Sequence, residues 1–201
     1  MIAADYLKLP PGIGGFKEAL IMVDYMMRWT WGFMLKKDGS STTTAKSLEY
    51  TCTCYAPPKA LFTDNGPHFQ GEELRAVCED FNIDQTTSPT YSPHCNGLVE
   101  NENKLLMRTL AKMCNPGPLP MAEPSITHLW PQFFNKALNI LNGCVTPVLG
   151  TSLRAILFGT IDGSTDIDDL IALDPEIGLH MELTDAQRDK VANHTTIHQA
   201  L

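Results

Sequence analysis

Residues 60–66 read Ala-Leu-Phe-Thr-Asp-Asn-Gly, a short apolar run that ends in an acidic turn. The run over Ala60–Thr63 has the length and composition of a buried strand. Asn-Gly behind Asp64 is a turn signal, because both residues tolerate the left-handed backbone. An aspartate at such a place usually forms the turn, so Asp64 taken alone indicates no chemistry. The elements on either side decide what the strand belongs to.

Strand and helix patterns alternate along the chain on both sides of this run. Before it, the patterns predict strands at 2–9, 19–27 and 29–36 and a helix at 41–55 capped by Ser40 or Ser41. After it, they predict a helix from about 71, a strand at 83–87, a loop at 88–97, and further helices, the next of which ends at 115–117 while another opens at Pro131. This order predicts a mixed α/β fold.

The helix at 41–55 connects the first strand to the strand at 60–63. A right-handed crossover would make these two strands parallel neighbours. Asp5 interrupts the apolar first strand and Asp64 ends the other, so both carboxylates could project into one crevice at a sheet edge. Glu100, in the first turn of the helix behind the 88–97 loop, could close that crevice.

Three carboxylates that converge without a basic partner repel one another strongly. A hard, oxygen-seeking dication such as Mg²⁺ or Mn²⁺ removes the repulsion. Each residue also has an ordinary interpretation: Asp64 as a turn former and Glu100 as a partner of the helix dipole. The combination with its spacing, and not any single residue, indicates a metal site.

Two segments around these acids carry a resemblance. Residues 63–69 (Thr-Asp-Asn-Gly-Pro-His-Phe) and 91–100 (Tyr-Ser-Pro-His-Cys-Asn-Gly-Leu-Val-Glu) resemble the catalytic core of the integrases of retroviruses and gypsy-like LTR retrotransposons. Thirty-five residues separate Asp64 from Glu100, which is the Asp–x35–Glu spacing of this DDE-type family. Residues 21–29 resemble its second strand, and residues 157–159 resemble its closing Leu-Leu-Phe-Gly.

The resemblance implies an RNase H-like fold, a five-stranded mixed sheet flanked by helices. It implies a metal-dependent polynucleotidyl transferase (nucleotidyltransferase) that processes the 3′ ends of retrotransposon DNA and transfers them into a target. Asp5, Asp64 and Glu100 would be the catalytic metal ligands, with two Mg²⁺ or Mn²⁺ ions per site. Asp24 competes with Asp5 for the first position, but the first ligand of the family lies on the opening strand, which favours Asp5.

We also expect DNA contacts at Asn65, Tyr91, Lys104 and Arg108, and Lys104 matches a DNA-contacting lysine position of the family. The two basic residues follow Glu100 at helical spacing, so an ordinary Glu–Lys pair is the alternative. Tyr91 could position a DNA end or simply pack within the loop.

The charge of the chain restricts the class of protein to which it can belong. Its formal charge is −8 and its pI about 5.1, which argues against a generic basic nucleic-acid binder. Residues 161–201 carry nine of the acidic and only two of the basic residues, so residues 1–160 are close to neutral. We expect a catalytic core at 1–160, lacking the zinc-binding N-terminal domain of the family, and an acidic, partly helical tail at 161–201.

The expected partners are DNA, both element ends and target, and further copies of the chain. No apolar run reaches the ~20 residues of a bilayer span, and no secretory signal is present. The six cysteines lack the spacing of a zinc site and indicate reduced thiols. The family implies a nuclear location.

Two further interpretations stay open. The chain could be a catalytically inactive, domesticated or decaying derivative that retains the fold for nucleic-acid or protein binding. It could also be another nuclease on the same fold. The intact set of three acids favours the enzyme.

Overall fold

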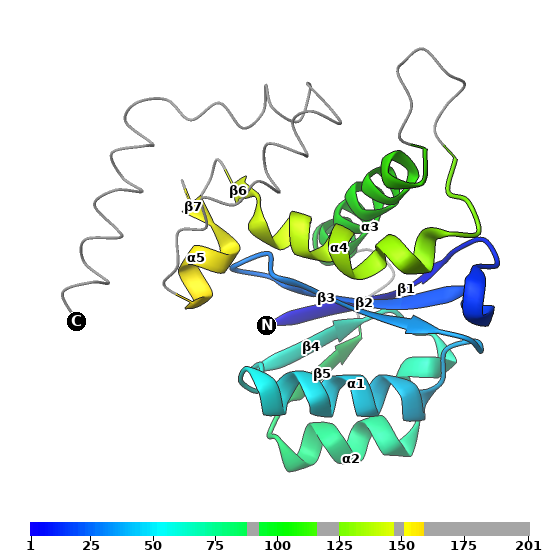
Figure 1. Ribbon diagram of the computed structural model, residues 1–201. Helices are drawn as coiled ribbons and strands as arrows, with labels where there is room; N and C mark the ends of the chain where they lie inside the picture. Colours follow the sequence, from blue (N-terminus) through cyan, green and yellow to red (C-terminus); the bar gives the residue numbers. More distant parts are fainter. Residues whose placement is uncertain (88–92, 116–124, 147–150, 159–201) are drawn as a thin grey trace. The chain divides into compact units, whose positions relative to one another are not determined.

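A five-stranded mixed sheet organises the chain in the computed structural model (Figure 1). The structure describes residues 1–87, 93–115, 125–146 and 151–158. The strand order is β3-β2-β1-β4-β5. The strands are β1 (Ile2–Lys8), β2 (Glu18–Asp24), β3 (Thr30–Leu35), β4 (Ala60–Thr63) and β5 (Asp84–Thr87). β1 is therefore the central strand.

The first three strands form an antiparallel meander, whereas β4 and β5 run parallel to β1. The expected crossover is confirmed, because β1 and β4 are parallel neighbours. Both lie inside the sheet, so the predicted crevice at a sheet edge is corrected to one at the ends of central strands. Six of the seven residues of β2 are buried, as expected for a strand covered on both faces.

Two helices cover one face of the sheet: α1 (Ser41–Cys54) and α2 (Glu72–Asp80). Ser40 caps α1, since its Oγ accepts the backbone N–H of Thr43 at 3.2 Å. The apolar core between these helices and the sheet joins residues of β1, β2, β4, α1 and α2, among them Leu20, Leu48, Leu61 and Leu74. The predicted helices and the crossover strand are thus present within a residue or two of their expected ends.

The helix α3 (Pro93–Cys114) covers the other face. The predicted loop at 88–97 is wrong from residue 93 onward, because Pro93 opens a helix instead of ending a loop. Proline suits the first helical turn, where its missing N–H leaves no bond unmade. Glu100 consequently lies about two turns inside α3 and not in its first turn.

The predicted strand at 19–27 is also too long. β2 ends at Asp24, whose Oδ1 accepts the backbone N–H groups of Met26 and Met27 at 3.0 and 2.7 Å. Arg28 then adopts a positive φ of 65°, and β3 begins at Thr30. The carboxylate forms the turn between the two strands.

Residues 1–135 form one compact unit, and a second unit begins at Lys136, within α4 (Trp130–Gly143). The second unit contains a two-stranded antiparallel ribbon, β6 (Val145–Thr146) with β7 (Thr151–Ser152), and the short helix α5 (Leu153–Phe158). The expected boundary near residue 160 and the expected acidic tail at 161–201 lie outside the described residues and stay predictions.

Within the described residues, no helix is long and apolar enough to span a bilayer. Among the described residues, the thiols of Cys52, Cys54, Cys78 and Cys114 are not in disulfides.

Candidate functional site

An open pocket of about 140 Å³ lies where β1, β4 and α3 meet. It is lined by Ala3, Ala4, Asp5, Phe62, Asp64, Val99 and Glu100. The parallel register pairs Ala3 of β1 with Phe62 of β4. Two residues further along each strand, Asp5 and Asp64 therefore lie side by side. The structure therefore brings all three predicted acids to one pocket from three separate elements.

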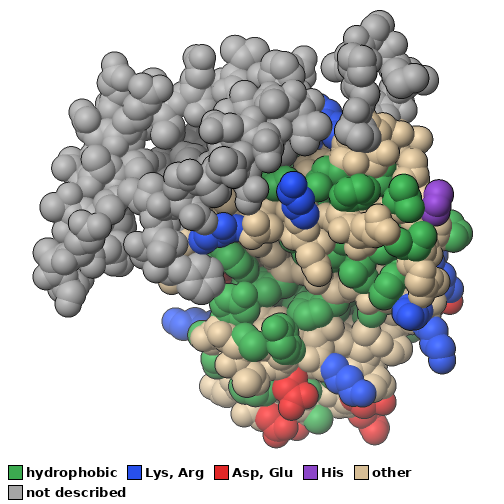
Figure 2. Space-filling model, viewed as in Figure 1, with side chains coloured by type: hydrophobic (Ala, Val, Ile, Leu, Met, Phe, Trp, Pro, Cys, Tyr) green, Lys and Arg blue, Asp and Glu red, His purple; other side chains and the backbone are tan. Residues whose placement is uncertain are grey.

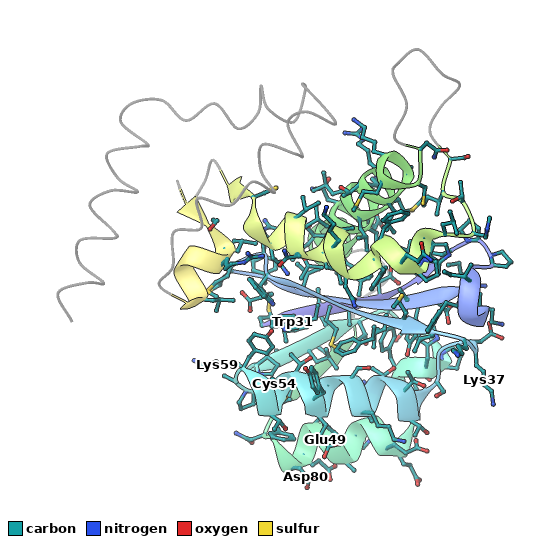
Figure 3. The ribbon with its side chains drawn as sticks, viewed as in Figure 1. Trp31, Lys37, Glu49, Cys54, Lys59 and Asp80 are labelled. Carbon is teal, nitrogen blue, oxygen red and sulfur yellow. The ribbon has the colours of Figure 1, made fainter. Side chains whose placement is uncertain are left out.

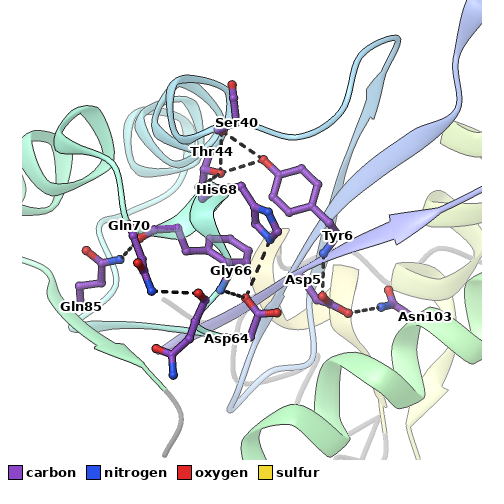
Figure 4. Close-up of polar contacts among 12 residues, drawn as sticks. Asp5, Tyr6, Ser40, Thr44, Asp64, Gly66, His68, Gln70, Gln85 and Asn103 are labelled. Carbon is purple, nitrogen blue, oxygen red and sulfur yellow. Dashed lines mark hydrogen bonds and ion pairs between the residues drawn. The ribbon is translucent and has the colours of Figure 1, made fainter.

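Asp5 is held at both of its oxygens. Oδ1 accepts the backbone N–H of Tyr6 at 2.8 Å, and Oδ2 accepts Nδ2 of Asn103 at 3.1 Å (Figure 4). Burial raises the pKa of Asp5, and the neighbouring carboxylates of Asp64 and Glu100 raise it further, while the Tyr6 bond and His68 oppose the rise. Binding of a proton or of a cation reduces the electrostatic repulsion between these carboxylates.

Asp64 is more exposed and is positioned by its own turn. Its Oδ1 accepts the backbone N–H of Gly66 at 2.8 Å and lies 3.9 Å from Nε2 of His68. A Cβ at Gly66 would come within 2.6 Å of the His68 ring and 2.8 Å of that same Oδ1. A side chain at position 66 would therefore displace the His68 ring or the Asp64 carboxylate, so the Asp-Asn-Gly turn keeps both in place.

A second layer of contacts supports this turn. Tyr6 packs edge-on against His68, with ring centroids 4.4 Å apart, and its hydroxyl shares a hydrogen bond with Thr44 Oγ1 at 2.8 Å. Thr44 Oγ1 in turn donates to the His68 carbonyl at 2.9 Å. On the other side of the turn, Gln70 Nε2 donates to the Asn65 carbonyl at 2.8 Å (Figure 4). These bonds tie the Asp64 turn to α1.

The donor set fits a hard divalent cation. Three carboxylates supply only oxygen ligands, which Mg²⁺ and Mn²⁺ prefer. The buried Oδ1 of Asn103, beside Asp5, has no hydrogen-bond donor among the described residues and adds another oxygen. The same part of the chain contains no ready-made cluster of three His, Cys, Asp or Glu at ligand distance, so the acids share a pocket without being closed around an ion.

Asp24 lies away from this pocket. It is paired with Ile2, at the start of β1, whereas Asp5 is paired with Ile21. Its Oδ1 forms the β2–β3 turn, and its Oδ2 lies 3.6 Å from the N-terminal ammonium of Met1. The Asp24 carboxylate therefore stabilises the β2–β3 turn.

The residues expected to contact DNA do not gather at one place as the three acids do. Asn65 is exposed in the Asp64 turn, and Lys104 and Arg108 are exposed on α3, one and two turns after Glu100. None of the three lines the pocket. Tyr91 lies outside the described residues.

Sequence reasoning missed two residues of the site, Asn103 and His68. Asn103 follows Glu100 by three positions, which places both on one face of a helix, so the spacing could have suggested it. His68 lies inside the Asp64 motif, but its contact with the carboxylate depends on the tight turn at Gly66.

Comparisons with known proteins show which proteins this chain is similar to. Residues 1–93 match the family model of the integrase core domain. The chain is 32% identical over 109 residues to the Pol polyprotein of Radiation murine leukemia virus (strain Kaplan), a match that covers 54% of this chain and 19% of the polyprotein. It is 29% identical over 154 residues to the Gag-Pol polyprotein of Koala retrovirus, covering 73% of this chain and 9% of that protein. The chain thus spans less than a fifth of either relative.

Solved structures show the same fold. A chain of the simian T-cell lymphotropic virus intasome, in complex with the PP2A regulatory subunit B56 gamma, is similar with a TM-score of 0.61 and 23% identity, over 81% of this chain and 55% of that one. The catalytic core domain of BIV integrase is similar with a TM-score of 0.60 and 18% identity, over 79% of this chain and 93% of that one. The fold is therefore RNase H-like, and residues 1–93 are similar in sequence to the integrase core domain.

Proposed function

We propose that this chain is the catalytic core of a metal-dependent polynucleotidyl transferase for DNA integration. Its reactions would be the processing of element 3′ ends and their transfer into target DNA. One observation carries the proposal: Asp5, Asp64 and Glu100 reach one pocket from β1, the turn after β4, and α3. The similarity of the chain to the integrase core domain supports the same activity.

In this proposal the three acids are the metal ligands. A bound divalent ion would supply Lewis-acid activation of the attacking oxygen and stabilisation of the leaving oxygen. The chain itself orients the ligands: Tyr6 N–H and Asn103 direct the two oxygens of Asp5, and Gly66 N–H directs Asp64. No nucleophilic side chain is needed, because water or a DNA 3′-hydroxyl attacks.

DNA would reach the pocket along its exposed rim. Asn65 lies beside Asp64, and Lys104 and Arg108 extend from Glu100 along α3, where they could hold phosphates. We propose that further copies of the chain assemble on the DNA and that the reaction takes place in the nucleus.

The test is metal-dependent cleavage of a branched DNA that mimics the joined product. The full chain is incubated with this DNA and Mn²⁺ beside Asp64→Asn and Glu100→Gln, with Asp24→Asn as the matched acidic control. We expect cleavage by the wild type and by the control, and a loss of at least about a thousandfold in the other two, since each removes a metal ligand.

An inactive derivative that retains the fold for nucleic-acid or protein binding is the second candidate. It predicts no cleavage by the wild type at any Mn²⁺ concentration. Cleavage that persists in Asp64→Asn would contradict the assignment of the ligands instead.

A further inference from the structure

Tyr6 and His68 connect the surroundings of the two aspartates across the sheet. Successive side chains of a strand point to opposite faces of the sheet. Asp5 therefore faces α3, where Asn103 bonds it, and Tyr6 faces α1, where its hydroxyl meets Thr44. The backbone N–H of Tyr6 also donates to Asp5 Oδ1 at 2.8 Å. Tyr6 thus contacts the first aspartate through its main chain and approaches the turn of the second through its ring.

The Tyr6 ring is held on several sides. Its hydroxyl lies 2.8 Å from Thr44 Oγ1 and 3.4 Å from the Ser40 carbonyl, at the start of α1. A Cβ at Gly39 would overlap the ring, so the backbone before α1 lies directly against it. The ring also approaches that of Phe69, with centroids 5.5 Å apart. Tyr6 therefore has little room to change its rotamer.

The hydroxyl of Tyr6 also supports the main chain of His68. Thr44 Oγ1 has one proton to donate, and the nearer of its two carbonyl acceptors is His68 at 2.9 Å, against 3.1 Å for Ser40. With that proton given to His68, Tyr6 is the donor in its own bond with Thr44. Thr44 is fully buried, so two hydrogen bonds in series join Tyr6 to the His68 backbone away from solvent.

The imidazole of His68 lies between Tyr6 and Asp64 (Figure 4). Its centroid is 4.4 Å from that of Tyr6 and 4.5 Å from that of Phe69, both in edge-on contact. Its Nε2 faces Asp64 Oδ1 at 3.9 Å. The Asp64 carboxylate therefore has the Gly66 N–H on one side and the imidazole on another.

These contacts restrict a carboxylate that would otherwise turn freely. The Asp64 side chain is 54% exposed, so few apolar neighbours limit its rotamers. The Gly66 N–H and the His68 ring limit the position of its Oδ1, at the pocket that Asp64 lines. Groups that orient a metal ligand typically change metal affinity or activity by about ten- to a hundredfold when they are removed.

We propose that His68 is a positioning residue for Asp64 and that Tyr6 acts through His68. The two rings hold the Asp64 carboxylate in the rotamer that binds a divalent ion, beside the Asp5 carboxylate that the Tyr6 backbone orients. This inference rests on the proposed function and adds two residues to it, neither of which is a metal ligand.

The test is a double-variant cycle that measures Mn²⁺ binding. His68→Ala removes the imidazole, Tyr6→Leu removes the ring but keeps the backbone N–H to Asp5, and the double variant combines the two. His68→Gln is the conservative variant, because its amide N–H can take the place of Nε2 without a titratable charge. The electron paramagnetic resonance signal of free Mn²⁺ gives the Kd of the full chain in the absence of DNA.

Phe33→Leu is the matched control. Phe33 is a partly buried residue of β3 that packs against the same apolar core as Tyr6, and its ring centroid lies 6.0 Å from that of Tyr50 on α1. It does not line the pocket. Figure 2 shows hydrophobic side chains at the surface over β3 and α1, so the control loses a ring from a similarly apolar place. Thermal melts establish which variants are folded, and the partly exposed His68 keeps the test decisive even if Tyr6→Leu unfolds.

We expect His68→Ala and Tyr6→Leu each to raise the Kd for Mn²⁺ about ten- to a hundredfold. The double variant should bind within about threefold of the weaker single variant, because the two residues act in series. His68→Gln and Phe33→Leu should stay within about threefold of the wild type. In cleavage of branched DNA, the Mn²⁺ concentration for half-maximal rate should rise with the Kd, while KM for the DNA stays unchanged.

Four results overturn the inference alone, provided that the wild type binds Mn²⁺ more tightly than Asp64→Asn does. They are wild-type affinity in His68→Ala, losses that multiply in the double variant, an equal loss in Phe33→Leu, and a His68→Gln variant that binds no better than His68→Ala. If the wild type binds Mn²⁺ no more tightly than Asp64→Asn, the metal site of the proposed function fails, and this inference fails with it.

Discussion

Glu102 offers a quantitative test of how α3 is packed. It is partly buried on the helix that carries Glu100, and burial raises its pKa from 4.5 to about 6, with Arg28 opposing the rise. At about 1.36 kcal/mol per pKa unit, this difference corresponds to about 2 kcal/mol. The folded protein binds the proton more tightly than the unfolded chain does, so stability falls as the pH rises from 4.5 through about 6.

Glu102→Gln removes the buried charge. We therefore expect a gain of about 2 kcal/mol in the free energy of unfolding at pH 7.5 and almost no gain at pH 4, where the wild-type side chain is protonated as well. The measurement is urea unfolding of the full chain, followed by circular dichroism at both pH values.

The matched control is Glu49→Gln, which removes an exposed carboxylate from α1 (Figure 3). Its effect should stay within about 0.5 kcal/mol at either pH. A destabilised Glu102→Gln, or a gain that is equal at pH 7.5 and pH 4, would refute the reasoning.

Four further predictions follow from named contacts. Asp5→Asn should raise the melting temperature in EDTA, because burial and two neighbouring carboxylates disfavour the Asp5 charge, and should abolish the rise that Mg²⁺ gives the wild type; an undiminished Mg²⁺ effect would contradict this. Gly66→Ala should cut Mn²⁺-dependent DNA cleavage at least about tenfold and lower stability by about 1–3 kcal/mol, since its methyl group would lie 2.6 Å from the His68 ring; wild-type cleavage would count against it. Gly97→Ala, within α3 and with no atom within 4 Å of the new Cβ, should stabilise the chain by about 0.5–1 kcal/mol in urea unfolding, and a loss would speak against the helix there. Ser40→Ala should cost about 1 kcal/mol in the same assay through the lost cap of α1; an unchanged midpoint would show that the cap contributes nothing.

Much of the fold could be predicted because its signals are local. The strand at Ala60–Thr63 is an apolar run between Pro58 and an Asp-Asn-Gly turn, and the structure has it with the predicted bounds. The parallel pairing with β1 follows from the connecting helix. The start of α3 was missed because Pro93 and Gly97 read as loop residues when only their local preferences are considered.

The site could be predicted as far as the sheet register determines it. Asp5 and Asp64 meet because the two strands are parallel and in step. The role of Asn103 could not be read in the same way, since a polar residue on a helix usually faces water and only long-range packing buries this one beside Asp5. Likewise, the sequence offers Asp24 as a candidate ligand, and only the structure shows its carboxylate forming the β2–β3 turn.

The central claim is that Asp5, Asp64 and Glu100 form one divalent-metal site. A crystal structure of the chain soaked with Mn²⁺ tests it most directly, because the anomalous signal of the ion marks its position. We predict an anomalous peak between the carboxylates of Asp5 and Asp64, with Glu100 turned toward it. A peak at Asp24, or none at the pocket at saturating Mn²⁺, would contradict the account.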